Sequence, residues 1–293
     1  MPSLYVLPFD HRGSFKKLIL EHGGDITEAE KEKLIHYKKV VFEGFKKVAE
    51  KRGVEDLAIL VDEEYGKDIH KEAKILGARN LLSTEKSGQD VFDFEYENWQ
   101  DHLLEIRPSY AKALIRVVIG EDNSLQNTRL KELSDFCKEN EIKFLIEPLI
   151  QPSKEDLVKC GDDKKRFDIE LRPERFAEAV REMHSAGIYP DVWKIEGTET
   201  KEAMDTCSEA AFEGEAENVE IVILGRGESM EKVEHWLTVG AKSKGVTGFA
   251  VGRTIFAEAL LKLRNGEINE EDASQEIARR YEYFIGVFEK AKS

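Results

Sequence analysis

Eight short apolar segments recur along the whole chain, and longer charged, amphipathic segments separate them. Each apolar segment spans four to seven residues, and most are rich in Val, Ile, Leu or Phe. Runs of this length and composition are typical of strands that are buried on both faces of a parallel sheet. The predicted strands are Leu4–Phe9, Leu57–Val61, Ala78–Leu82, Ala113–Ile119, Ile142–Ile146, Asp191–Ile195, Val219–Leu224 and Gly248–Val251.

The segments between the strands carry the marks of helices. Thr27 and Glu30 form a sequence pattern typical of a capping box, and Gly53 is placed to end the helix, so residues 28–52 are predicted to be helical. Pro173 fits a first helical turn and Gly187 fits a helix end. The other predicted helices are Arg129–Asn140, Pro173–Ala186, Glu228–Ser243 and the last 30 residues.

About eight strand–helix repeats predict an α/β protein with a parallel sheet and right-handed crossovers. Such repeats close naturally into a (β/α)8 TIM barrel, here a single domain over residues 1–293. A doubly wound open sheet is the alternative, but no glycine-rich phosphate loop follows Phe9. The C-terminal helix is expected to complete the outer ring or to form a homo-oligomer contact.

The composition narrows the classes of partner. A formal net charge of -15 argues against nucleic-acid or anionic-membrane binding, although a small anionic substrate still fits a locally basic pocket. The three cysteines (Cys137, Cys160 and Cys207) are widely spaced and suggest neither a disulfide framework nor a zinc site. With no predicted signal peptide or membrane span, we expect a cytoplasmic protein.

Polar residues gather where the predicted strands end. Asp10, His11 and Arg12 follow the first strand, Glu147 ends the fifth, and Lys194 lies within the sixth. Glycine and arginine follow the seventh and eighth strands. Barrel enzymes place their chemistry at the carboxyl ends of the strands, so this distribution predicts one active site there.

Lys194 is the most informative of these residues because Trp193 and Ile195 flank it in a strand. An amine buried among apolar groups or near other cations is expected to have a lowered pKa and to become a nucleophile. A neutral amine can attack a ketone and form an iminium ion. An ion pair with Glu147 or Glu196 is an equally open structural interpretation.

Three further interior charges have open interpretations. Glu147 could move protons or could merely neutralise Arg116 or Lys194. Asp10 could act as an acid or base, or could cap the helix after Gly13. Arg116, in the fourth strand, could bind an anion and lower the pKa of a nearby lysine, or could pair with an acid such as Asp62 or Glu147.

Two Gly-Arg sequences predict a phosphate site. Gly225, Arg226 and Gly227 follow the seventh strand, and Gly252 and Arg253 follow the eighth, where a helix is predicted to begin. Glycines allow close backbone approach to an anion, and helix amides and guanidinium groups bind it. Barrel enzymes often bind phosphate between these two loops. Surface turns with solvated arginines are the alternative.

These motifs together resemble a known enzyme family. The residues 7–14 resemble the opening of the tagatose-bisphosphate-aldolase-like class I aldolases, and the segments around residues 61–66, 146–149, 193–196 and 252–253 resemble later strands of the same enzymes. The nearest resemblance is to the barrel domain fused to the inositol-catabolism kinase 5-dehydro-2-deoxygluconokinase. That domain is associated with cleavage of 2-deoxy-5-keto-gluconate 6-phosphate.

The resemblance implies a Schiff-base aldolase that needs no metal or other cofactor. It implies that Lys194 is the nucleophile, Glu147 the proton shuttle and Asp10 an acid, base or positioning group. Arg12 and Arg253 would hold the substrate or its phosphate. His11, Arg116 and the pair Gly225–Arg226 depart from the family pattern, which has Gln, Lys and Ser-Ala there, and these departures concern the substrate.

Three functions follow as hypotheses. The first is cleavage of 2-deoxy-5-keto-gluconate 6-phosphate to dihydroxyacetone phosphate and malonate semialdehyde. The second is an aldolase for tagatose bisphosphate or a sulfosugar phosphate. The third is a sugar-phosphate-binding barrel without catalysis, in which Lys194 stays protonated.

Overall fold

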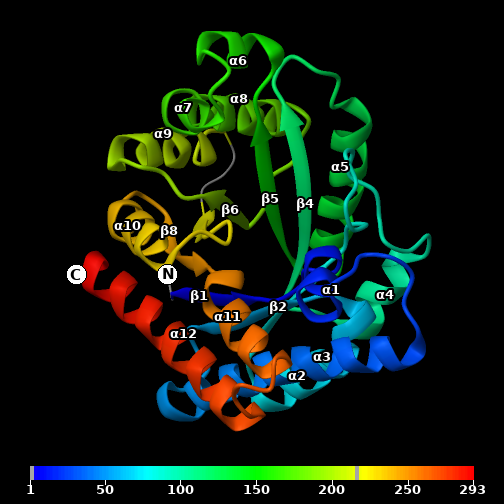
Figure 1. Ribbon diagram of the computed structural model, residues 1–293. Coiled ribbons are helices and arrows are strands. Elements are labelled where there is room, and N and C mark those ends of the chain that lie inside the picture. Colours follow the sequence, from blue (N-terminus) through cyan, green and yellow to red (C-terminus); the bar gives the residue numbers. More distant parts are fainter. Residues whose placement is uncertain (1–2, 215–217) are drawn as a thin grey trace.

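Eight parallel strands pair in chain order and the last pairs with the first, so the sheet closes into a barrel (Figure 1). The computed structural model describes residues 3–214 and 218–293. It confirms the predicted single-domain (β/α)8 barrel. The strands are β1 (Leu4–Pro8), β2 (Leu57–Val61), β3 (Arg79–Ser83), β4 (Tyr110–Val118), β5 (Lys143–Gln151), β6 (Val192–Glu196), β7 (Glu220–Leu224) and β8 (Val246–Ala250).

Helices surround this barrel, and α12 lies along α2 on the outside (Figure 1). No helix in the described ranges is long and apolar enough to cross a membrane. The helices are α1 (Gly13–Leu20), α2 (Glu28–Arg52), α3 (Glu63–Leu76), α4 (Trp99–Ile106), α5 (Ser124–Glu139), α6 (Lys154–Lys159), α7 (Lys164–Glu170), α8 (Arg172–Ser185), α9 (Lys201–Ala211), α10 (Met230–Gly240), α11 (Arg253–Arg264) and α12 (Glu270–Lys292).

Local signals in the sequence explain several of these boundaries. Helix α2 has the predicted bounds: the Thr27 hydroxyl accepts a hydrogen bond from the Glu30 amide, the Glu30 carboxylate accepts one from the Thr27 amide, and Gly53 follows with a φ of 84°. The fourth strand differs from its prediction because it begins at Tyr110 rather than Ala113. Its first residues pair with β5 although a lysine interrupts their apolar pattern.

Side chains alternate between the barrel interior and the helix layer, as the twofold repeat of a strand requires. Trp193 and Ile195 belong to the large core between barrel and helices, and Trp193 packs edge-on against Phe176. Lys194, between them, faces the interior. A separate apolar cluster fills the lower interior: Leu4, Val6, Ala58, Leu60, Leu81, Tyr110, Leu145, Val192, Val222 and Ala250.

The length of the strand pairing differs around the barrel. Strands β4 and β5 are long and pair along their full length, from Tyr110 with Lys143 to Val118 with Gln151. In the described chain, β5 pairs with β6 at Leu145 and Ile146 and no further. The upper part of β5 therefore continues with β4 away from β6 (Figure 1). Helices α6 and α7 lie in the connection that follows β5.

A buried histidine on α3 makes the stability of the fold sensitive to pH. His70 is almost fully buried, and its Nδ1 lies 3.1 Å from the side-chain nitrogen of Asn80. Burial lowers the pKa of His70 from its ordinary value of 6.5 to about 3. The folded protein therefore keeps this ring neutral at pH values where the unfolded chain protonates it.

We expect the free energy of unfolding to fall as the pH decreases below 6.5, by about 1.4 kcal/mol per pH unit from His70 alone. The sign follows because the unfolded chain binds the extra proton, so acid favours unfolding. Urea titrations between pH 4.5 and 7.5 should show a shallower pH dependence for His70→Gln than for the wild type. Equal slopes for the two proteins would contradict this origin of the acid sensitivity.

Candidate active site

A cluster of five charged side chains lies in the barrel above the apolar interior cluster. Asp10 follows β1, Glu85 follows β3, and Lys112, Glu147 and Lys194 lie on β4, β5 and β6. All five are buried. Buried charges are costly unless they are paired or used in function, so the cluster is a candidate site on physical grounds.

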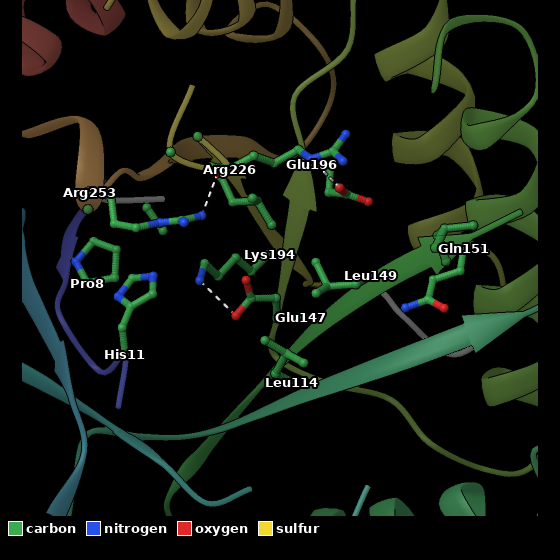
Figure 2. A pocket seen from close by; sticks show the side chains of 16 residues that line it. Pro8, His11, Leu114, Glu147, Leu149, Gln151, Lys194, Glu196, Arg226 and Arg253 are labelled. Carbon is green, nitrogen blue, oxygen red and sulfur yellow. Dashed lines mark hydrogen bonds and ion pairs between the residues drawn. The ribbon is translucent and has the colours of Figure 1, made fainter. Parts of the chain in front are cut away.

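Two amines share one carboxylate at the centre of the cluster. The Lys194 Nζ lies 2.8 Å from Glu147 Oε2, and the Lys112 Nζ lies 3.1 Å from the same oxygen. Lys112 also donates hydrogen bonds to Asp10 Oδ2 at 2.9 Å and to Glu85 Oε1 at 2.7 Å. The ion pair of Lys194 that the sequence left open is therefore made with Glu147 (Figure 2).

The three carboxyl groups have different proton affinities. Burial alone would raise the pKa of Asp10 and of Glu147, but the charge of Lys112 holds the pKa of Asp10 well below its usual range and lowers that of Glu147. Burial raises the pKa of Glu85, and Lys112 offsets that rise only in part. Burial would lower the pKa of Lys112, but Asp10 and Glu147 raise it well above its ordinary value. Lys112 is thus a fixed cation that keeps Asp10 and Glu147 ionised.

Lys194 and Glu147 border two cavities. The first, of about 430 Å³, lies between these residues and the loops after β7 and β8 (Figure 2). The second, of about 380 Å³, runs toward α1, the segment after β3, and β4. His11 and Leu114 also line both cavities. A substrate carbon bound at Lys194 therefore has room on two sides.

The loops after β7 and β8 meet at the first cavity. Arg226 and Gly227 have positive φ values of 52° and 77°, and the Arg253 guanidinium lies over Gly227 and donates to the Arg226 carbonyl at 2.6 Å. A Cβ at Gly252 would lie 2.2 Å from the Pro8 carbonyl oxygen, so that position requires glycine. Helix α11 begins at Arg253, as predicted, and no side chain caps it.

The two arginines of these loops differ in their partners. Arg226 forms ion pairs with Asp168 at 2.8 Å and with Glu196 at 3.0 Å, so its charge is largely neutralised. Within residues 3–214 and 218–293, Arg253 has no carboxylate partner. Arg253 is therefore the stronger candidate for binding an anion in the first cavity.

The segment after β1 contributes three predicted site residues. The alternative interpretation of Asp10, a helix cap, is wrong, because Asp10 pairs with Lys112 and α1 begins after Arg12 with no side-chain cap. Arg12 pairs with Glu95 and donates to the Glu85 carbonyl, so it links the segment after β1 to the segment after β3. Arg12 also lines the second cavity, and its role in binding substrate stays a prediction.

His11 lines both cavities, with its Nδ1 3.9 Å from Asp10 Oδ1. Burial lowers the pKa of His11 to about 4, and the nearby cations Arg253 and Lys194 act in the same direction. The ring is therefore neutral at pH 7. It offers a substrate a hydrogen-bonding group rather than a charge.

Arg116 is not the interior cation of the cluster that the sequence suggested. Its guanidinium donates to the Gln89 carbonyl and lines the second cavity, and in the described chain it pairs with neither Asp62 nor Glu147. Lys112 takes the interior place instead. The prediction missed Lys112 because it began the fourth strand at Ala113, although alternation from Tyr110 puts 110, 112, 114 and 116 on one face.

Glu85 is the second residue that the sequence did not reveal. It lies beyond the end of β3, in a segment with no strand or helix pattern, and its second carboxylate oxygen accepts from the Leu114 amide at 3.3 Å. Glu85 belongs to the site because Lys112 donates a hydrogen bond to it. The spacing of the two residues in the sequence does not predict this contact. Among the described residues, no group of three or more His, Cys, Asp or Glu side chains is arranged to hold a metal ion.

Comparisons with known proteins place this site in context. A family model described as "Uncharacterized protein conserved in bacteria (DUF2090)" matches residues 1–292. The solved structure of Cgl0159 from Corynebacterium glutamicum is similar, with a TM-score of 0.56 and 14% identity over 96% of this chain and 86% of that one. A Schiff-base-forming fructose-1,6-bisphosphate aldolase is similar with a TM-score of 0.57 and 14% identity, over 96% of this chain and 94% of that one.

A fructose-bisphosphate aldolase from Slackia heliotrinireducens is also similar, with a TM-score of 0.51 and 14% identity over 94% of this chain and 85% of that one. At this level of identity the similarities show a shared barrel fold. The narrower resemblance to tagatose-bisphosphate-aldolase-like enzymes stays a prediction.

Proposed function

Because the chain belongs to the DUF2090 family and its barrel holds a buried lysine between two cavities, we propose that it is a class I aldolase, a carbon–carbon lyase that acts on a phosphorylated keto sugar or sugar acid. One observation carries this proposal. The Lys194 amine contacts Glu147 at 2.8 Å and opens toward a cavity that ends at Arg253. An amine, a proton acceptor and an anion site are the groups that Schiff-base cleavage of a keto-sugar phosphate requires.

In the first step, Lys194 gives a proton to Glu147 and attacks the ketone carbon of the substrate. The carbinolamine that forms loses its hydroxyl group as water, with the proton that Glu147 returns to it. The product is an iminium ion between Lys194 and the substrate. The short contact between the amine and Glu147 allows this proton transfer without movement of the backbone.

In the second step, the iminium ion draws electrons from the bond between Cα and Cβ. Glu147 takes the proton of the Cβ hydroxyl, the Cα–Cβ bond breaks, and an aldehyde leaves while an enamine remains on Lys194. Protonation of the enamine and hydrolysis then release the ketone product and restore the amine. Asp10 is a weak base, because Lys112 keeps its pKa low, and it fits a role in orienting a substrate hydroxyl.

The first cavity suits the phosphate of this substrate. The guanidinium of Arg253 lines this cavity beside Lys194. The backbone of three glycines also lines it, at positions 225, 227 and 252. The proposed substrate is 2-deoxy-5-keto-gluconate 6-phosphate, whose ketone lies one carbon from the phosphate-bearing carbon. Cleavage would give dihydroxyacetone phosphate and malonate semialdehyde.

Borohydride trapping tests the reaction type. With 2-deoxy-5-keto-gluconate 6-phosphate present, borohydride should reduce the iminium ion and leave a stable adduct on Lys194. Peptide mass spectrometry should place the adduct on the peptide that contains Lys194, with no adduct on the peptide of the exposed Lys143 or in samples without substrate. An absence of any adduct under conditions of turnover would contradict the Schiff-base mechanism.

The ion pair of Lys194 also fits the third hypothesis, a sugar-phosphate-binding barrel in which the amine stays protonated. That protein would gain thermal stability from sugar phosphates but would form no adduct and release no product.

Rates of cleavage for phosphate-, carboxylate- and sulfonate-bearing ketoses would separate the sugar-acid substrate from tagatose bisphosphate and sulfosugar phosphates.

A further inference from the structure

The second cavity, of about 380 Å³, is nearly as large as the first, and the proposed reaction steps at Lys194 and Glu147 leave its outer part without a role. It begins at Lys194 and Glu147 and extends to the opposite side from Arg253. Three parts of the chain that are distant in sequence form its outer part: α1 with the residues just after it, the segment after β3, and β4. Its charged outer residues are Lys17, Lys86 and Arg116.

Arg116 has an unusual set of partners for an arginine in this site. It is half-buried, and one of its nitrogens donates to the Gln89 carbonyl. Arg12 and Arg226, which also line the cavities, each pair with a carboxylate. In the described chain, Arg116 in the second cavity and Arg253 in the first have backbone carbonyl partners and no carboxylate.

The remaining charges of the second cavity also favour an anion at its outer end. The acids at its inner end, Asp10 and Glu85, both contact Lys112. Lys17 is exposed on α1, and Lys86 forms one ion pair, at 2.9 Å, with Asp93. The outer end therefore carries three cations, Lys17, Lys86 and Arg116. One carboxylate, Asp93, pairs with one of them.

We propose that the second cavity binds a second anionic group of the substrate, a carboxylate or a phosphate, through Arg116 and the lysines around it. This inference rests on the proposed function in placing the substrate ketone at Lys194. The substrate class is then a keto-sugar phosphate with an anion at each end of its carbon chain. Arg253 holds one end, Arg116 holds the other, and the bond that breaks lies between them.

Binding of ligands that lack a ketone tests the inference without catalysis. The probes are sorbitol 6-phosphate, gluconate 6-phosphate and sorbitol 1,6-bisphosphate, which carry one anionic group, a phosphate with a carboxylate, and two phosphates. By isothermal titration calorimetry, we expect the wild type to bind at least one of the two doubly anionic probes about 10- to 100-fold more tightly than sorbitol 6-phosphate. The probe that shows the gain identifies the second group as carboxylate or phosphate.

Arg116→Gln should remove most of this preference while leaving the affinity for sorbitol 6-phosphate within about threefold. Arg253→Gln should weaken all three probes. Arg79→Gln is the matched control, because Arg79 also donates to a backbone carbonyl, that of Ser3 at 2.7 Å, but lies at the start of β3, outside both cavities. It should leave all three affinities unchanged.

Two results would overturn the inference. One is a wild type that binds neither doubly anionic probe more tightly than sorbitol 6-phosphate. The other is an Arg116→Gln variant that loses affinity equally for all three, since Arg116 would then act only by holding the segment at Gln89. A missing borohydride adduct together with the expected binding pattern would reject the aldolase reaction and leave the second anion site standing.

Discussion

Replacing Lys194 with arginine should lower kcat/KM for cleavage of 2-deoxy-5-keto-gluconate 6-phosphate by at least about a thousandfold. Arginine keeps a positive charge beside Glu147, so the buried carboxylate retains a partner and the barrel should stay folded. A guanidinium stays protonated and cannot form the iminium ion. Assay of dihydroxyacetone phosphate release with a coupled dehydrogenase measures the loss directly.

The control for this variant is Lys143→Arg. Lys143 begins β5 at the opposite end of the barrel and is exposed, so the same substitution there should leave the rate unchanged. A Lys194→Arg protein that unfolds at the wild-type urea concentration and still cleaves at the wild-type rate would reject Lys194 as the nucleophile.

Replacing Lys112 with methionine should reduce the free energy of unfolding by about 3–5 kcal/mol, because it leaves three buried carboxyl groups without their shared cation. Methionine has nearly the same length, so the loss reflects charge more than packing. Urea titration at pH 7 measures the effect. The charge argument also predicts that Glu85→Gln in the same protein recovers part of the loss, since it removes one uncompensated carboxylate.

A second buried lysine provides the comparison. Lys38 on α2 is also inaccessible to solvent, but it pairs with one carboxylate, Asp62, and donates to the Phe9 carbonyl at 2.8 Å. Lys38→Met should therefore cost less than Lys112→Met. An equal or larger loss for Lys38→Met, or no recovery with Glu85→Gln, would show that Lys112 does not balance the carboxylates as argued.

The barrel could be predicted from the sequence because its evidence is local and repeated. Each strand is a short apolar run, and signals such as the Thr27 capping box and Gly53 mark helix ends within a few residues. Lys194 and Glu147 could be found because they interrupt apolar strands at the end where barrel enzymes work. Neither inference requires knowledge of which side chains touch.

The pairing of the charged groups could not be predicted in the same way. Lys112 meets Asp10 across the barrel, 102 residues apart in sequence, and Glu85 approaches it from beyond the end of β3. Arg226 looks like an anion site by its position after β7, but Asp168 from α7 neutralises it. Closure of the barrel decides which charged side chains meet. A pattern of strands predicts that the barrel closes, but it does not predict the individual side-chain contacts.

The early end of pairing between β5 and β6 has a consequence for how this protein could change over evolution. The ladder there ends at Ile146 and Trp193, while Leu149 and Gln151 farther along β5 line the first cavity. At the carboxyl end of the barrel, β5 and β6 are therefore not hydrogen-bonded to each other in the described chain. The connection that contains α6 and α7 directly follows β5 in the sequence. Insertions or substitutions in that connection could resize the entrance for longer or shorter molecules without disturbing the hydrogen bonds that close the rest of the barrel.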